Sequence, residues 1–141
     1  MQFVVDRDLV LKKLAFIETC VQELCTLAQP ALIDSDIREE RFVVHTLQLA
    51  IQAALDVASH IVSDERLGEP QTNRALFDLL AKGGWISPTL METMRDMAGF
   101  RNLVVHGYEN VDLGIVRDIV ENQLQDLLDF VAAIRAGMAC A

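Results

Sequence analysis

The chain contains one long, almost uncharged stretch, and this stretch limits what the chain can fold into. Between Arg41 and Asp64 the only formally charged side chain is Asp56, and no proline or glycine interrupts residues 36–67. These residues can therefore form one helix of about 30 residues, roughly 45 Å long. A helix that is apolar nearly all round is buried on more than one side. We expect it to pack within its own bundle on one face and against a second subunit on another.

The same stretch is too polar to cross a membrane. Residues 42–62 include histidine, glutamine and aspartate side chains, which are costly in a bilayer: His45, Gln48, Gln52, Asp56 and His60. Charged residues at positions 6–8 precede any apolar run that could form a signal peptide. A net charge of −9 argues against broad binding to nucleic-acid backbones, which needs a large basic surface. We therefore expect a cytoplasmic protein without a membrane or DNA partner.

Four further helices are predicted from apolar spacing and from helix-capping residues. At the start of the long stretch, Asp36 with Glu39 resembles a capping box. For one of the four further helices, Ser87 with Pro88 is a favoured start. No strand-like alternation of useful length and no internal repeat is present. The sequence predicts a single all-α domain over residues 1–141, an antiparallel helical bundle of about five helices that forms a homodimer. The expected helices cover residues 6–29, 36–67, 72–82, 88–106 and 112–136.

The cysteines do not indicate a metal site or a disulfide framework. Cys20, Cys25 and Cys140 are odd in number, and no Cys/His pair has the spacing of a zinc site. We expect reduced thiols, no metal and no cofactor.

The best candidate for a functional site is the segment RNLVVHGY, residues 101–108. The imidazole of His106 can transfer protons near neutral pH. The guanidinium of Arg101 can bind a phosphate through two hydrogen bonds and offset the negative charge that develops there. Asn102 could orient either group, and Tyr108 could position the phosphate or the histidine. Such groups suit a site that binds a phosphate and transfers protons beside it.

The spacing of this cluster raises a geometric problem. On an ideal helix five residues advance about 500°, so His106 lies roughly 140° from Arg101, whereas Tyr108 returns almost to the face of Arg101. Two arrangements would resolve this. The helix could distort or end near Gly107 and swing His106 round, or two subunits could line one groove.

Asp56 is a second candidate, as a supporting residue of the site. A lone carboxylate on an apolar helix is costly to bury unless it is paired. We expect it to pair with Arg101 and hold it in place, or to pair with a structural arginine or with His60.

The segment from Arg101 to Tyr108 resembles the R-x4-H-x-Y signature of the HepT-like branch of the HEPN family (higher eukaryote and prokaryote nucleotide-binding domains). The resemblance extends over nearly the whole chain. It includes the long helix at 38–62, the turn at 68–72, the Gly-Gly-Trp-Ile segment at 83–86, and the Met94, Met97 and Phe100 approach to the motif.

The resemblance implies a dimeric, HEPN-like helical bundle and a metal-independent endoribonuclease. HepT-like members typically act as toxins beside a minimal nucleotidyltransferase antitoxin, which is thought to silence them by adding AMP to the motif tyrosine. By position, Arg101 and His106 would be the catalytic pair, Asn102 the polar residue that often follows the arginine, and Tyr108 the modified residue. The alternatives are a non-catalytic module that binds a nucleotide or the partner enzyme, and a purely structural helical dimer.

Overall fold

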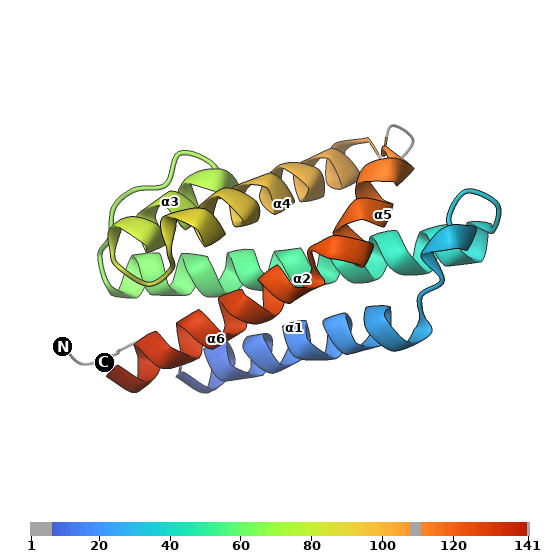
Figure 1. Cartoon of the computed structure of the whole chain (residues 1–141). Coiled ribbons are helices and arrows are strands. Elements are labelled where there is room, and N and C mark those ends of the chain that lie inside the picture. Colours follow the sequence, from blue (N-terminus) through green and yellow to red (C-terminus); the bar gives the residue numbers. More distant parts are fainter. Residues whose placement is uncertain (1–6, 108–110, 141) are drawn as a thin grey trace.

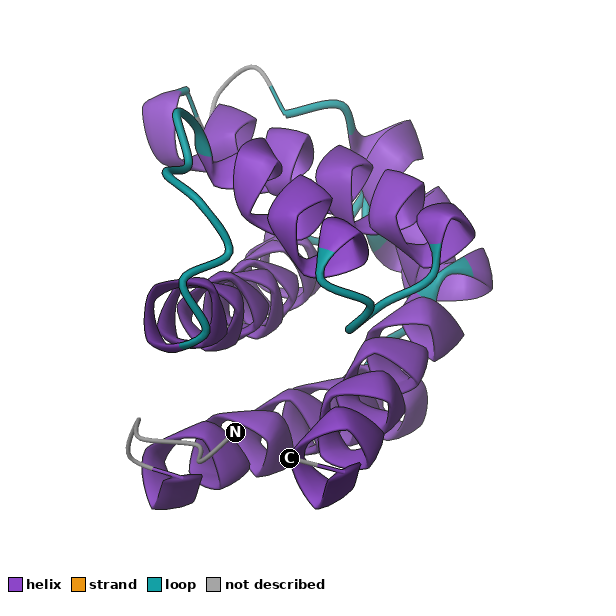
Figure 2. Ribbon diagram, turned by 90° about the vertical axis from the view of Figure 1, so that its left-hand side faces the viewer, coloured by secondary structure: helices purple, strands orange, loops and turns teal. Residues whose placement is uncertain are grey.

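The computed structural model describes residues 7–107 and 111–140, and within these ranges every regular element is helical. The long helix α2 lies at the centre, with α1 and α6 on one side and α3 and α4 on the other (Figures 1 and 2). This arrangement confirms the predicted all-α bundle. In chain order the elements are α1 (Arg7–Leu27), the 3₁₀ turn η1 (Pro30–Leu32), α2 (Ile37–Asp64), α3 (Asn73–Lys82), α4 (Pro88–His106), α5 (Leu113–Asn122) and α6 (Leu124–Cys140).

The unusual composition of α2 is explained by its central position. It contacts α1, α3, α4, α5 and η1, and Ile37 and Leu49 are the large apolar side chains of this helix that stay exposed. By length and hydropathy α2 could span a membrane, but 61% of its most apolar window is buried inside the bundle, as in the core helix of a globular protein. The composition of α2 therefore does not by itself require a second subunit.

Local capping side chains set where the helices begin, as predicted. Asp36 accepts a hydrogen bond from the backbone N–H of Arg38 at 2.9 Å. Glu39 does not close the expected capping box on Asp36; it accepts from the backbone N–H of Gln29 at 2.8 Å and so holds the loop before η1. Three other helices begin at side chains that cap their first turn: Thr72, Ser87 and Asp112.

The prediction of one continuous helix over residues 112–136 is wrong. The chain leaves helical geometry at Gln123, where φ is −124° and ψ is 5°, and α5 and α6 follow different directions (Figure 1). The side-chain amides of Asn122 and Gln123 donate to the carboxylate of Asp118, at 2.8 and 3.1 Å, and support this break. The break lets α5 pack against η1 and α2, while α6 packs against α1 and α4.

Close packing joins the two outer layers around α2. Phe77 of α3 and Phe130 of α6 meet edge to face, with ring centroids 5.9 Å apart. Cys20 is buried in the core, and this burial, with the nearby charge of Glu23, raises the pKa of its thiol to about 11. All three cysteines are free thiols.

Gly137 is a position where the fold tolerates no side chain. A Cβ atom built on Gly137 would lie 2.5 Å from the Cε3 and Cζ3 atoms of the Trp85 ring. We expect Gly137→Ala to destabilise the protein by about 1–2 kcal/mol, since overpacking costs about 1–3 kcal/mol and the gain in helix propensity returns up to about 1 kcal/mol. Urea unfolding followed by circular dichroism measures the change. The same substitution in a Trp85→Ala background should be neutral or stabilising, and a more stable Gly137→Ala single variant would contradict this packing.

Candidate functional site at the end of helix α4

Arg101, Asn102 and His106 all lie on the last turns of α4, which stays regular to its end. Gly107 donates its backbone N–H to the carbonyl of Leu103 at 2.9 Å, the normal spacing of an α-helix, and the helix ends only there. Residues 88–107 therefore do not bend in a way that would bring His106 toward Arg101. On a regular helix the two side chains point about 140° apart.

Arg101 of α4 is half-buried, and its guanidinium is held by a side-chain amide. Its Nη1 donates to the Asn102 Oδ1 at 3.1 Å, and Asn73 Nδ2 of α3 donates to the same oxygen at 3.2 Å. The Nε of Arg101 is buried and has no hydrogen-bond partner among the described residues. Asn102 thus holds the guanidinium of Arg101 against α3, while most of the five N–H donors of Arg101 make no hydrogen bond with a described residue.

Asn73 is a site residue that sequence reasoning missed. It is the first residue of α3 and lies 29 positions before Asn102. No local pattern marks it, because its contact depends on how α3 crosses α4. A second link between these helices is the ion pair of Arg95 with Asp78, which the sequence did not indicate either.

His106 is exposed at the last position of α4 and makes no hydrogen bond with a described residue. An imidazole in this position is open to solvent and could exchange protons with a bound molecule. Its neighbours Leu103 and Val105 leave 60% and 47% of their surfaces exposed. The end of α4 therefore presents a free imidazole beside uncovered apolar side chains.

Asp56 does not meet either residue of the candidate pair. Its carboxylate binds Lys13 of α1 at 3.1 Å and accepts from Gln52 at 2.9 Å. The expected pairing with Arg101, with another arginine or with His60 is therefore not observed, because α1 runs beside α2 and presents a lysine there. Tyr108, the remaining candidate, lies outside the described residues.

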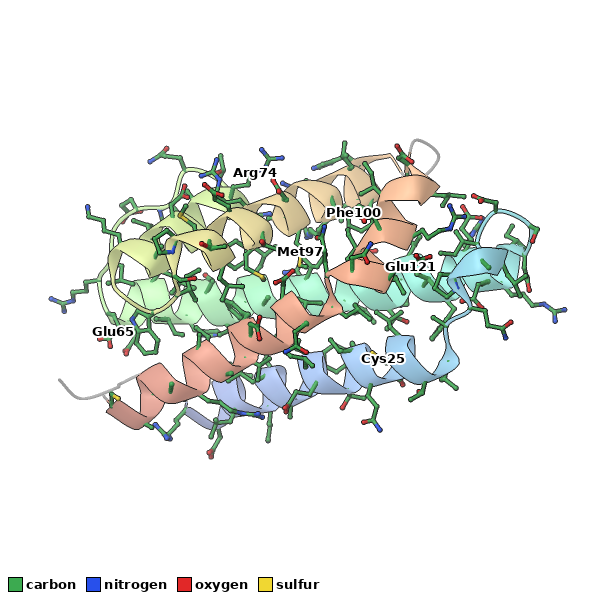
Figure 3. The ribbon with its side chains drawn as sticks, in the orientation of Figure 1. Cys25, Glu65, Arg74, Met97, Phe100 and Glu121 are labelled. Carbon is green, nitrogen blue, oxygen red and sulfur yellow. The ribbon has the colours of Figure 1, made fainter. Side chains whose placement is uncertain are left out.

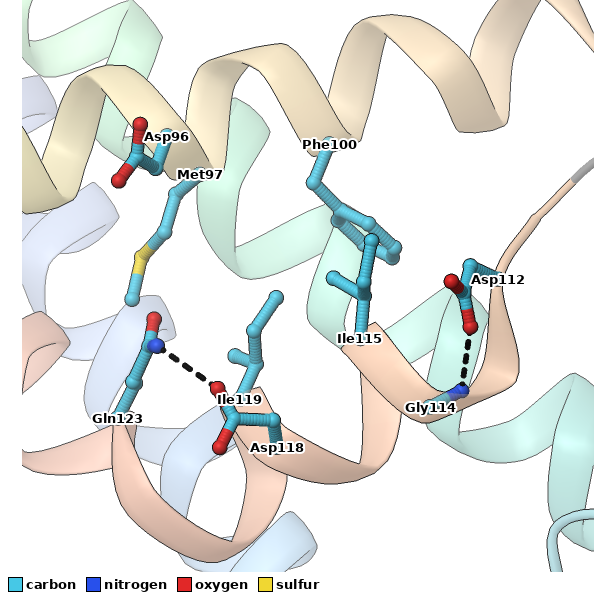
Figure 4. Close-up of a pocket in the computed structure, with 9 residues that line it drawn as sticks. All are labelled: Asp96, Met97, Phe100, Asp112, Gly114, Ile115, Asp118, Ile119 and Gln123. Carbon is cyan, nitrogen blue, oxygen red and sulfur yellow. Dashed lines mark hydrogen bonds between the residues drawn. The ribbon is translucent and has the colours of Figure 1, made fainter.

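A cavity of about 370 Å³ lies between α4 and α5, beside Phe100 (Figure 4). Three carboxylates line it: Asp96, Asp112 and Asp118. Those of Asp112 and Asp118 are engaged by the backbone N–H of Gly114 and the side chain of Gln123. Such a negative lining is unfavourable for a phosphate, so we do not expect a phosphate to bind inside this cavity.

Known proteins match this chain over most of its length. The family model described as ribonuclease HepT-like matches residues 17–134. The mRNA nuclease HepT of Shewanella oneidensis is 32% identical over 130 residues, which are 92% of this chain and 98% of that protein. The tRNA nuclease HepT of Aphanizomenon flos-aquae is 30% identical over 102 residues, 72% of this chain and 69% of that protein.

A solved structure extends the similarity to the fold. The tri-AMPylated HEPN toxin of Shewanella oneidensis, in complex with its MNT antitoxin, superposes with a TM-score of 0.85 at 31% identity. The superposition covers 93% of this chain and 99% of the Shewanella toxin chain.

Proposed function

Because this chain belongs to the HepT-like ribonuclease family, we propose that it is the toxin of a toxin–antitoxin pair and a metal-independent endoribonuclease of the cytoplasm. The observation that carries the proposal is the end of α4. An exposed imidazole, His106, and a guanidinium with unused donors, Arg101, lie within one and a half turns of helix. These are the two groups that RNA cleavage by the 2′-hydroxyl needs.

In the proposed reaction His106 accepts the proton of the ribose 2′-hydroxyl. The 2′-oxygen then attacks the adjacent phosphorus, and the bond from phosphorus to the 5′-oxygen of the next nucleotide breaks. The leaving 5′-oxygen takes up a proton from solvent, and the protonated His106 then releases its proton to solvent, so the products are a 2′,3′-cyclic phosphate and a free 5′-hydroxyl. Arg101 binds the non-bridging oxygens, where negative charge increases in the transition state.

The directions of the two side chains lead us to propose that the reaction takes place in a homodimer. Arg101 and His106 of one regular helix cannot converge on one phosphate, since they point about 140° apart. Two copies that pair the ends of their α4 helices would bring the arginine of one protomer to the histidine of the other. The same contact would cover the exposed apolar side chains of Leu103 and Val105.

The contacts of Asn102 support a role in the site, whereas those of Asp56 do not. Asn102 belongs to the proposed site because its amide oxygen binds Arg101 directly. Asp56 contacts neither Arg101 nor His106, and its pairing with Lys13 favours a structural role, the joining of α1 to α2.

The direct test is incubation of the purified, unmodified protein with a single-stranded RNA, with and without EDTA. We expect equal cleavage in both samples and fragments that end in a cyclic phosphate. Intact RNA would refute the enzymatic function. Cleavage that EDTA abolishes would refute its independence from metal.

We further propose that a nucleotidyltransferase antitoxin silences the protein by attaching AMP to Tyr108. We expect the added anion to occupy the guanidinium of Arg101 and so to exclude RNA. Co-expression with the proposed nucleotidyltransferase antitoxin should increase the intact mass by one or more AMP units and abolish cleavage. The Tyr108→Phe variant, which lacks only the hydroxyl, should gain no AMP there and stay active. A mass gain that maps to other residues in the wild-type protein would contradict this assignment.

The alternative is a module that binds a nucleotide or the partner enzyme and cuts nothing. The net charge of −9 favours it over a nuclease with a basic track. Calorimetry with nucleotides should then show binding that is lost in Arg101→Ala, while RNA stays intact.

A further inference from the structure

Arg74, on the first turn of α3, is seated on the backbone of α4 at Gly99. A Cβ atom built on Gly99 would lie 2.1 Å from the Nη2 of Arg74 and 3.0 Å from its Cζ. Glycine inside a helix costs about 1 kcal/mol relative to alanine, yet here it is buried in the middle of a 19-residue helix. The guanidinium occupies the space that a side chain would need. Figure 3 shows Arg74 on the side of the bundle formed by α3 and α4.

Among the described residues, no carboxylate forms an ion pair with Arg74. Arg95, Arg117 and Arg135 each pair with a carboxylate, whereas Arg74 is exposed and makes no hydrogen bond or ion pair with a described residue. Asp96 lines the same small cavity, of about 240 Å³, without forming an ion pair with it. A guanidinium that is held in place and has no hydrogen-bond partner within residues 7–107 and 111–140 is suited to bind a phosphate.

Helical geometry places this guanidinium on the face of α4 that carries His106. Seven residues separate Gly99 from His106, so their directions differ by only about 20° and their positions by about 10 Å along the axis. Asn102 lies between them and is about 60° from Gly99. Arg101, in contrast, points about 160° away from Gly99.

We propose that Arg74 binds an RNA phosphate next to the one that is cut, so that the strand follows α4 from Gly99 to His106. This inference rests on the proposed ribonuclease function. Arg74 is too far from His106 to act on the scissile phosphate, so it is a substrate-binding residue rather than a catalytic one. Its loss should raise KM and leave kcat nearly unchanged.

Binding is measured separately from cutting in a His106→Ala background, by fluorescence anisotropy with a fluorescein-labelled single-stranded RNA at several salt concentrations. Arg74→Gln should weaken binding about tenfold, as expected for loss of a charged hydrogen bond. It should also reduce the slope of log K against log salt by about 0.7, the share of one phosphate contact. The matched control is Arg66→Gln, an exposed arginine in the turn after α2, which should change the slope by much less.

A second variant tests the packing of the Arg74 guanidinium on Gly99. Gly99→Ala keeps every charge and favours the helix, but its methyl group displaces the guanidinium of Arg74. We expect weaker RNA binding with no loss of thermal stability. Unchanged affinity and salt slope in Arg74→Gln, or in a folded Gly99→Ala, would overturn the proposal. Because binding is measured without cleavage, these results stand even if the wild-type protein cuts no RNA and the proposed function fails.

Discussion

Replacing His106 with alanine is expected to slow RNA cleavage about 10²–10⁴-fold, the contribution of a general acid–base group. The stability should change little, because the side chain is exposed and makes no hydrogen bond with a described residue. Single-turnover cleavage of a labelled RNA gives the rate, and urea unfolding gives the stability. The control is the His45→Ala variant, which removes an exposed histidine of α2. This variant should cleave RNA at the wild-type rate. Full activity of His106→Ala would remove it from the mechanism.

Arg101→Ala is expected to reduce the cleavage rate about 10²–10³-fold, the effect of losing one donor that stabilises a developing anion. It should also cost some stability, because the half-buried guanidinium binds Asn102. Arg101→Lys separates the two effects, since it keeps the charge but loses the two-pronged geometry, and it should recover only part of the rate.

The control for Arg101 lies on the same helix. Arg95→Ala removes the half-exposed ion pair with Asp78, so it should lower stability by at most about 1 kcal/mol and leave the cleavage chemistry intact. If Arg95→Ala and Arg101→Ala slow cleavage equally, the role of Arg101 is merely to hold α4 in place.

The local parts of this structure could be predicted from the sequence. Helix starts depend on a capping side chain and the three residues after it, so Asp36 and Ser87 were sufficient to place α2 and α4. The inward face of α1 follows from the spacing of its apolar residues, and the residues of that stripe from Val10 to Leu24 are buried.

The break between α5 and α6 could not be predicted, because the apolar residues continue in phase across it. Val116, Val120, Leu124 and Leu127 keep helical spacing and are all buried. The break at Gln123 depends instead on which helices each half packs against. The spacing of apolar residues indicates that one face of a helix is buried, but it does not indicate which other helix covers that face.

Contacts between helices could not be predicted from the sequence either. The partner of Asp56 is Lys13, 43 positions away, and it depends on the register of α1 against α2. Asn73 and Arg74 reach α4 only because α3 crosses it near Gly99 and Asn102. The motif on α4 therefore predicted the centre of the candidate site, while the residues around it required the fold.

The most direct test of the central claim is the mixing of two inactive variants, Arg101→Ala and His106→Ala. If each site takes its arginine from one protomer and its histidine from the other, a mixed dimer holds one complete site. After random exchange half of the dimers are mixed, so the mixture should regain about a quarter of the wild-type cleavage rate. A mixture that exchanges subunits but stays as inactive as its two components would contradict a site shared by Arg101 and His106 across the dimer.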